Sequence, residues 1–141
     1  MAQSDDINIA SAMAAFEAKQ FSRAMQLFIP FAEGGDADAQ HRVAIMYQNG
    51  LGVVKNCTEA LRWMQAAAEQ GYAIAQHGLG FMYLEGECTD KDPAKAVQWF
   101  EKSANQGLAG SQTTLAMMYE QGNGVAQDMD KAKAWYAKAG F

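Results

Sequence analysis

The segment AMMYEQGNGVAQDMDKAKAW, residues 116–135, decides the fold of this chain because it occurs in three related copies. The earlier copies read AIMYQNGLGVVKNCTEALRW at residues 44–63 and GFMYLEGECTDKDPAKAVQW at residues 80–99, so the period is 36 residues (80 minus 44, and 116 minus 80). In each copy a tyrosine, a glycine, an alanine and a tryptophan return to the same places. A period in this range is typical of stacked repeats, in which each unit buries its apolar face against the next.

Each copy predicts a helix, a glycine-containing loop and a second helix. In the first copy apolar residues recur at helical spacing over about residues 38–48, and Gly50 then supplies a backbone conformation that a helix excludes. The second helix begins after an Asn or Asp, whose side-chain oxygen accepts the unpaired amides of the first turn. These N-cap residues are Asn56, Asp92 and Asp128. Gly71 and Gly107 follow the second helices, where a left-handed C-cap is usual.

A weaker copy precedes the three clear ones. The residues 36 positions upstream of Ala60, Gly71 and Ala75 are again Ala, Gly and Ala. Helices are expected over residues 7–18 and 21–32, with Pro30 kinking or shortening the second. We therefore predict an all-α solenoid of about four stacked antiparallel helix pairs, eight helices, in a single domain over residues 1–141. Its parts are a divergent N-terminal pair at residues 5–36 and repeats at residues 37–72, 73–108 and 109–141.

Small and large residues pair in a way that favours close helix packing. The second helices place Ala60, Ala96 and Ala132 opposite Trp63, Trp99 and Trp135. A Trp side chain buries on the order of 200 Å². We therefore expect the three Trp residues to be core residues, each costing about 3–5 kcal/mol to replace with Ala.

Charge and hydropathy argue against a nucleic-acid-binding protein and against a membrane-spanning one. The net charge is −5, with eleven Lys and Arg scattered among sixteen acids, whereas a nucleic-acid binder normally shows a basic stripe. No apolar run approaches the ~18 residues that a membrane span needs. Residues 1–8 lack the basic-then-apolar pattern of a signal peptide. A cytoplasmic location is therefore expected, with a periplasmic or secreted location as the alternative if a signal peptide has been removed.

The two cysteines occupy different repeat positions, because subtracting 36 from 88 gives 52 and not 57. A disulfide scaffold places its cysteines in a regular register. We therefore expect Cys57 and Cys88 to be free thiols in a reducing compartment. The alternative is a bridge between neighbouring loops in an exported protein.

The repeated residues resemble the Sel1-like repeat, a relative of the tetratricopeptide repeat. Repeat three carries this pattern as LAMMYEQGNGV at residues 115–125, followed by Asp128, Lys131, Ala132 and Trp135. Repeat one has Asn56 in the Asp position and Glu59 in the Lys position. In repeat two GECT, residues 86–89, replaces the Gly-x-Gly-Val of the family. We expect this departure to loosen or reshape the loop without losing the helix pair.

The resemblance covers about residues 37–141 and implies a right-handed helical solenoid that acts as an adaptor or scaffold in protein complexes. The family is found in bacteria and eukaryotes, and we expect a bacterial protein. One bacterial branch is bridged by cysteines, but its cysteine pair lies within each repeat. Cys57 and Cys88 do not fit that arrangement.

The sequence offers little catalytic chemistry. His41 and His77 are 36 residues apart, so they project alike from successive first helices. Packed helices lie roughly 8–10 Å apart, too far for two imidazoles to hold one zinc without further ligands. The Gly-x-Gly loops follow helices rather than strands, which is the wrong context for a dinucleotide fingerprint. We predict that the chain is no enzyme and binds no metal or cofactor.

The outward positions of the first helices are the candidate site. In a helix-pair solenoid they line the concave face, where an exposed apolar patch binds a peptide or a helix. The predicted residues are His41, Ile45, Gln48, His77, Phe81, Leu84, Thr113, Met117 and Glu120. Among them Ile45, Phe81 and Met117 form an apolar column, which is either exposed or part of the core.

The predicted function is therefore an adaptor or scaffold that binds a protein or peptide partner on this face. The alternative is a structural protein that self-associates weakly through the last helix, residues 131–138, because no further helix follows to cover Trp135 and Tyr136.

Overall fold

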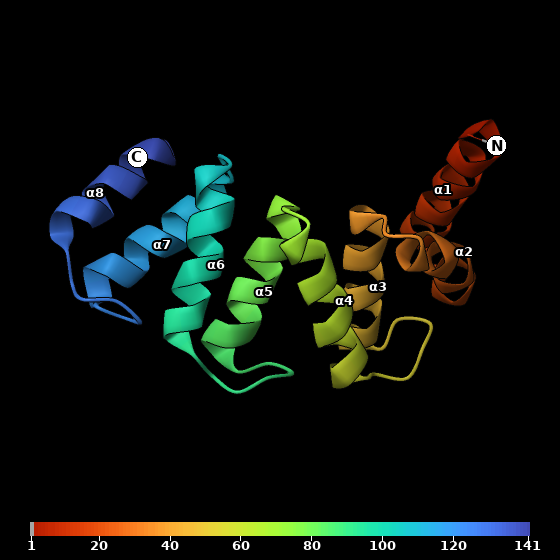
Figure 1. Cartoon of the computed structure of the whole chain (residues 1–141), viewed down its shortest axis with the longest axis horizontal. Coiled ribbons are helices and arrows are strands. Elements are labelled where there is room, and N and C mark those ends of the chain that lie inside the picture. The colour runs from red at the N-terminus through yellow and green to blue at the C-terminus, as the bar shows by residue number, and fades with distance from the viewer. Residues whose placement is uncertain (1) are drawn as a thin grey trace. The chain divides into compact units, whose positions relative to one another are not determined.

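The computed structural model describes residues 2–141, and the side chains of residues 9–141. These residues form eight α helices and no strand, which confirms the predicted all-α repeat fold (Figure 1). The helices are α1 (Ala2–Glu17), α2 (Phe21–Glu33), α3 (Ala37–Asn49), α4 (Cys57–Glu69), α5 (Ala73–Glu85), α6 (Pro93–Asn105), α7 (Ala109–Gln121) and α8 (Met129–Lys138). The first helix starts earlier than expected, at Ala2 rather than at about residue 7.

The helices form two compact units, and the division lies within α4 at Ala67. In the first unit α1 packs against α2, and α2 against α3. Its core is built from small and apolar residues, among them Ala24, Phe28, Val43, Ala44, Met46, Ala60 and Met64. In the second unit α6 packs against both α5 and α7, and α7 against α8 (Figure 1). Its core cluster contains Ala96, Val97, Phe100, Ala104, Leu115, Met118, Tyr119 and Ala132.

The predicted N-caps and glycine stops are confirmed. The side chains of Asn56, Asp92 and Asp128 accept from backbone amides three residues ahead, at 3.1, 3.1 and 3.0 Å. Gly71 and Gly107 have φ values of 89° and 93°, as left-handed C-caps require. Pro30 does not shorten α2, which reaches Glu33 and has the same 13 residues as α3. Pro30 and Gln26 are both exposed, so the carbonyl that Pro30 leaves without an amide partner can be solvated.

One buried glutamine, not predicted from the sequence, closes each turn between a second helix and the first helix of the next repeat. Gln40, Gln76 and Gln112 are 36 residues apart and buried. Each Nε2 donates to the backbone carbonyl eight residues upstream, that of Ala32, Ala68 and Ala104, at 3.1, 3.2 and 3.1 Å. The last carbonyls of a helix have no partner within it. Each of these carbonyls also accepts the N–H of the glycine three residues on, at 3.1, 3.0 and 3.0 Å. The glutamine is therefore a second donor, and the bond satisfies its own buried amide.

The loop of repeat two keeps the shape of the other two loops, so the expected reshaping was wrong. All three connections have seven residues and begin with a left-handed glycine, Gly50, Gly86 or Gly122. Their closing bonds match, since Asp92 N–H donates to the Tyr83 carbonyl at 2.8 Å and Asp128 N–H to the Tyr119 carbonyl at 3.0 Å. Cys88 adopts a φ of 63°, close to the 73° of Gly52 and the 75° of Gly124. Backbone hydrogen bonds therefore hold the loop in this conformation without the second glycine.

Cys57 and Cys88 are both disulfide-bonded, so the prediction of two free thiols was wrong. The prediction relied on the repeat register, and Cys57 does lie at the start of α4 whereas Cys88 lies in the loop between α5 and α6. A disulfide requires that two cysteines be close in space, and a shared position within the repeat is not needed for that.

Two of the three tryptophans lie at the edge of the core rather than inside it. Trp63 is 8% exposed, but Trp99 and Trp135 are only half-buried. Lysine ammonium groups lie over their outer faces, Lys102 at 4.4 Å from the ring centre of Trp99 and Lys138 at 4.6 Å from that of Trp135. The prediction that all three are core residues is correct for Trp63 alone. The second-helix alanines, in contrast, are fully buried.

Candidate functional site

Six of the nine predicted site residues lie on two helices of the second unit. His77, Phe81 and Leu84 are on α5, and Thr113, Met117 and Glu120 occupy the same positions on α7. Met117 is 44% exposed and Glu120 is also exposed, whereas the other four are half-buried. Spacings of four and then three residues place each set along one side of its helix.

Phe81 contributes both to the core and to the surface of this unit. Phe81 and Leu84 pack against the core cluster of the second unit. The Phe81 ring meets Phe100 edge to face at 5.0 Å and His77 at 4.9 Å. The apolar column is therefore neither wholly exposed nor wholly part of the core. Met117 is exposed, whereas Phe81 is partly held in the core.

His77 is tied into the unit by a chain of hydroxyl groups. Its Nδ1 lies 2.6 Å from Ser111 Oγ, and Ser103 Oγ donates to Ser111 Oγ in turn. Burial lowers the pKa of His77 below its usual 6.5, which favours the neutral ring. Although this is a Ser–His contact, Ser103 and Ser111 are fully buried. A substrate cannot reach either hydroxyl, so the arrangement joins α5, α6 and α7 and provides no accessible nucleophile.

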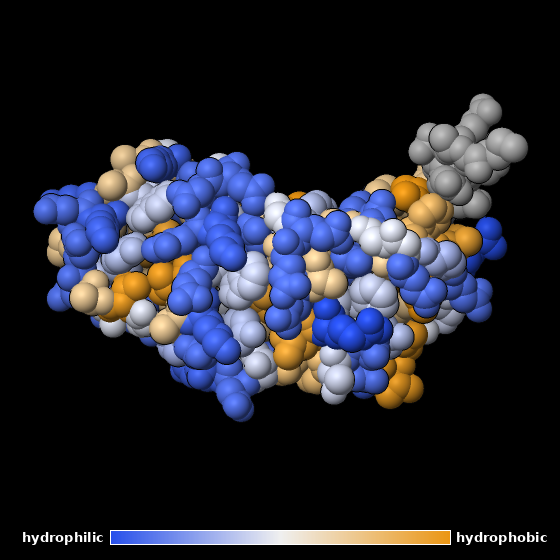
Figure 2. All heavy atoms as spheres, viewed as in Figure 1, coloured by the Kyte–Doolittle hydropathy of each residue, from blue (hydrophilic) through white to orange (hydrophobic). Residues whose placement is uncertain are grey.

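One exposed residue of this surface, Ile74, was missed in the sequence. Ile74 is 46% exposed and lies on α5 seven residues before Phe81, which is two helical turns along the same side. The other repeats have Asp38 and Gly110 at this position, so no repeated apolar residue pointed to it. We call the surface formed by Ile74, His77, Phe81, Leu84, Thr113, Met117 and Glu120 the α5–α7 face. In Figure 2 much of the visible surface is hydrophilic, and one of the separate apolar areas lies over α7.

The matching residues of the first unit have a more polar setting. His41, Ile45 and Gln48 on α3 are all half-buried. Beside them Arg42 pairs with Asp38 at 3.2 Å and lies over the ring of Phe16 at 5.3 Å. Burial lowers the pKa of His41, with Asp38 opposing the shift and Arg42 adding to it. At the positions of Asp38 and Arg42, α5 has the uncharged residues Ile74 and Gly78.

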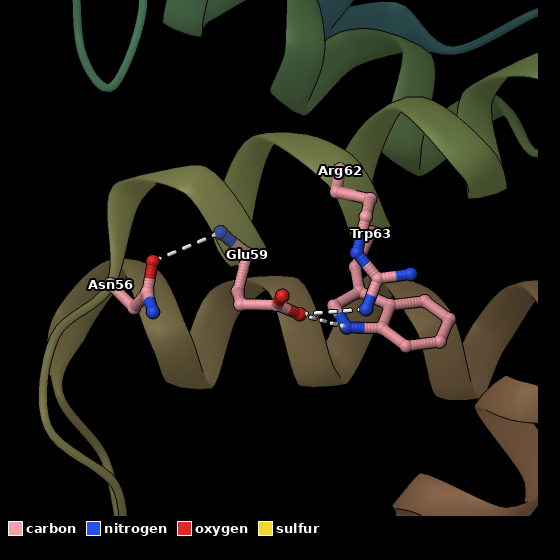
Figure 3. Close-up of polar contacts among 4 residues, drawn as sticks. All are labelled: Asn56, Glu59, Arg62 and Trp63. Atoms are coloured by element: carbon pink, nitrogen blue, oxygen red, sulfur yellow. Dashed lines mark hydrogen bonds and ion pairs between the residues drawn. The ribbon is translucent and has the colours of Figure 1, made fainter.

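The polar contacts of Trp63 explain why its ring is no ligand platform. Asn56 caps α4 by accepting the Glu59 amide, and the Glu59 carboxylate accepts from Arg62 Nη2 at 2.7 Å and from Trp63 Nε1 at 3.1 Å (Figure 3). The Arg62 guanidinium lies over the indole at 4.3 Å. Both the N–H and one face of the indole are therefore already occupied.

Among the described residues no three His, Cys, Asp or Glu side chains are grouped as a metal ion would require. Within residues 2–141 no helix has both the length and the apolar character of a membrane span.

Comparisons with known structures and proteins place the chain. It is similar to c5321, a protective antigen of uropathogenic Escherichia coli strains displaying an SLR fold, with 38% identity and a TM-score of 0.80 over 82% of this chain and 25% of that one. It is also similar to a Sel1 repeat protein from Oxalobacter formigenes, with 32% identity and a TM-score of 0.88 over 92% of this chain and 54% of that one. This chain thus spans between a quarter and about half the length of these two relatives.

Cysteine rich protein B of Helicobacter pylori shares the fold at 18% identity, with a TM-score of 0.68 over 84% of this chain and 87% of that one. A search of curated proteins finds no match. The sequence model of the Sel1 repeat matches three consecutive segments, residues 37–72, 73–108 and 109–140. Since these segments make up well over half of the residues, the chain belongs to the Sel1 repeat family.

Proposed function

We propose that this protein holds a peptide or a protein segment on the α5–α7 face. Sel1 repeats are generally protein–protein interaction modules. The observation that carries the proposal is that Ile74 and Met117 are both nearly half exposed. Ile74 lies in helical register with the half-buried Phe81 and Leu84, and Met117 occupies the repeat position of Phe81. Apolar side chains grouped at the surface, with polar neighbours such as Thr113 and Glu120, are typical of an interaction site.

The composition of the face suits a binding role. Met117 is unbranched and polarisable, so it adapts to differently shaped partners. Phe81 is held by His77 and Phe100, so it offers a rigid aromatic anchor that loses little entropy on binding. An extended segment or an amphipathic helix would bury these side chains at regular intervals.

Affinity capture and mass spectrometry on the wild type and two variants test this proposal. Ile74→Ser/Met117→Ser removes exposed apolar contacts and is expected to change the free energy of unfolding by only about 0.5 kcal/mol per site. Phe81→Ser is unsuitable because Phe81 also packs on the core. Val54→Ser is the matched control, since Val54 is 88% exposed in the loop between α3 and α4. Partners kept by the wild type and the control but lost by the double variant support the face, whereas equal capture by all three rejects it.

Self-association through α8 remains a separate prediction. Trp135 and Tyr136 pack partly against the core of the second unit. Lys138 lies over the Trp135 ring, and the Phe141 ring is 6.0 Å from that of Tyr136. These contacts cover part of the edge that self-association would use, and they favour the α5–α7 face. Light scattering over a range of concentrations tests self-association apart from binding on the α5–α7 face. Stacking through α8 requires that the average molar mass rise with protein concentration.

The disulfide-bonded cysteines support an oxidising compartment, such as the periplasm or the cell exterior, in place of the cytoplasm expected from the sequence. Disulfides form and persist in oxidising compartments and are rare in the cytosol. Trapping thiols by alkylation in intact cells tests this location, because a cytoplasmic protein would be alkylated at both cysteines.

A further inference from the structure

The two helices of the α5–α7 face carry charges of one sign. The only charged residue of α5 is Glu85, and the only charged residue of α7 is Glu120. Both are exposed, and both lie in the last turn of their helices. The face therefore has apolar residues along its length and a carboxylate at the end of each helix.

The connections that follow these helices extend the same charge. Residues 73–92 carry four acids and one base, Lys91, for a net charge of −3, and residues 109–128 carry two acids and no base. The corresponding residues 37–56 of the first unit carry Asp38, Arg42 and Lys55, for a net charge of +1. The negative charge therefore belongs to α5, α7 and the connections that follow them, and the matching segment of the first unit lacks it.

The helix termini add to this potential. The carbonyl end of a helix carries a partial negative charge, which Lys or Arg in the last turn usually offsets. The last turns of α6 and α8 contain Lys102 and Lys138, but those of α5 and α7 contain no basic residue. The ammonium groups of Lys95 and Lys131 lie 5.4 Å from the ring centres of Tyr83 and Tyr119. They come from α6 and α8, the helices packed against α5 and α7.

We infer that the segment bound on the α5–α7 face is a basic amphipathic peptide. Its apolar side chains would lie against Ile74, Phe81 and Met117, and its Lys or Arg side chains would reach Glu85 and Glu120. The inference rests on the proposed function and adds the chemistry of the partner. Complementary charge at the rim of an interface mainly sets specificity and association rate. The same two carboxylates repel anionic partners, such as nucleic acid or an acidic peptide.

The probe is a phage-displayed library of random 12-residue peptides, selected on the immobilised full chain. The wild type is expected to select peptides that combine apolar residues with Lys or Arg. The charge-reversed variant Glu85→Lys/Glu120→Lys is expected to select acidic peptides instead. An exposed ion pair changes affinity by up to about five-fold, so a synthetic selected peptide should bind Glu85→Gln/Glu120→Gln several-fold more weakly. Its binding to the wild type should also weaken as salt is raised.

Glu33→Gln/Asp130→Asn is the matched control, because it removes two exposed negative charges from α2 and α8. The inference is overturned if the selected peptides need Ile74 and Met117 but show no basic enrichment, or if they bind Glu85→Gln/Glu120→Gln as tightly as the control. In that outcome the proposed function stands. If the peptides bind Ile74→Ser/Met117→Ser unchanged, or if no peptide is enriched over an uncoated surface, the proposed function fails and the inference fails with it.

Discussion

The ring of Phe100 on α6 packs directly over Gly80 on α5, so closely that a Cβ at residue 80 would lie 2.8 Å from ring atom Cε1. Phe100 is fully buried, and its ring also meets the rings of Phe81 and His77 on α5 edge to face. The ring therefore has little room to move away. Repeat one has Ala44 and Met64 at these two positions. Repeat two therefore combines a smaller residue on the first helix with a larger side chain on the second.

Gly80→Ala is expected to lower the free energy of unfolding. Forcing an extra methyl into a packed core costs about 1–3 kcal/mol, which exceeds the roughly 1 kcal/mol that Ala gains over Gly as a helix former. Gly110→Ala is the matched control, because its Cβ would lie an acceptable 3.4 Å from His77 Cε1. Urea unfolding should find the control unchanged or up to about 1 kcal/mol more stable. Equal stability of the two variants would contradict the packing argument.

Gly80→Ala/Phe100→Met recreates the residue pair of repeat one and tests the same contact. Residues in contact deviate from additivity, so the double variant should lose less stability than the sum of the two single variants. Additive losses would show that the ring and the glycine are independent.

Gln112→Leu is expected to cost about 0.5–1.5 kcal/mol of unfolding free energy, the net contribution of one hydrogen bond. The substitution removes the bond from Nε2 to the Ala104 carbonyl, which keeps the bond from the Gly107 N–H. Gln127 is the control, because its Nε2 also donates to a backbone carbonyl, that of Glu120 at 2.9 Å, but at an exposed site. Gln127→Leu should change stability by less than about 0.5 kcal/mol. Thermal and urea unfolding of both proteins measure the difference.

Stability is expected to fall as the pH drops below about 6.5. Burial lowers the folded-state pKa of His41 and His77 from the usual 6.5, so the unfolded chain takes up protons first. The histidines therefore contribute their full stability above 6.5 and lose it as the pH falls toward their folded pKa values. Urea unfolding between about pH 7.5 and 5.5 checks this, in a range above the ordinary titration of Asp and Glu.

His77→Asn should flatten part of that pH dependence, because Asn does not titrate and its side-chain amide can take the place of Nδ1 beside Ser111. NMR titration of the two imidazoles gives the pKa values directly. A folded-state pKa at or above 6.5 for both would contradict the prediction.

The native protein is expected to contain no free thiol. Because Cys57 and Cys88 are both disulfide-bonded, a thiol-reactive dye should give no signal in denaturant without reductant and two equivalents after reduction. The intact mass should rise by about 2 Da on reduction, as two hydrogens are added to one bond. Two reactive thiols in the unreduced protein would contradict the structure.

The helices were predictable because their signals are local. The period of 36, the Asn and Asp caps and the glycine stops located α3 to α8 to within about two residues, since capping depends on neighbours three or four positions away. The site was predictable only in part. The exposed Met117 was found by its register, but Ile74 was missed because the other repeats have Asp38 and Gly110 there. The half-burial of Phe81 depends on Phe100 from another helix.

By itself the sequence determined the repeat, the helix boundaries, the family and the spacing of outward residues, because all of these follow from backbone periodicity. Only the tertiary structure decided which repeated residues differ in role. It shows the disulfide-bonded state of Cys57 and Cys88, the partial exposure of Trp99 and the contact of His77 with buried Ser111. Each of these depends on side chains that come from other helices and change from one repeat to the next, and a shared period carries no information about them.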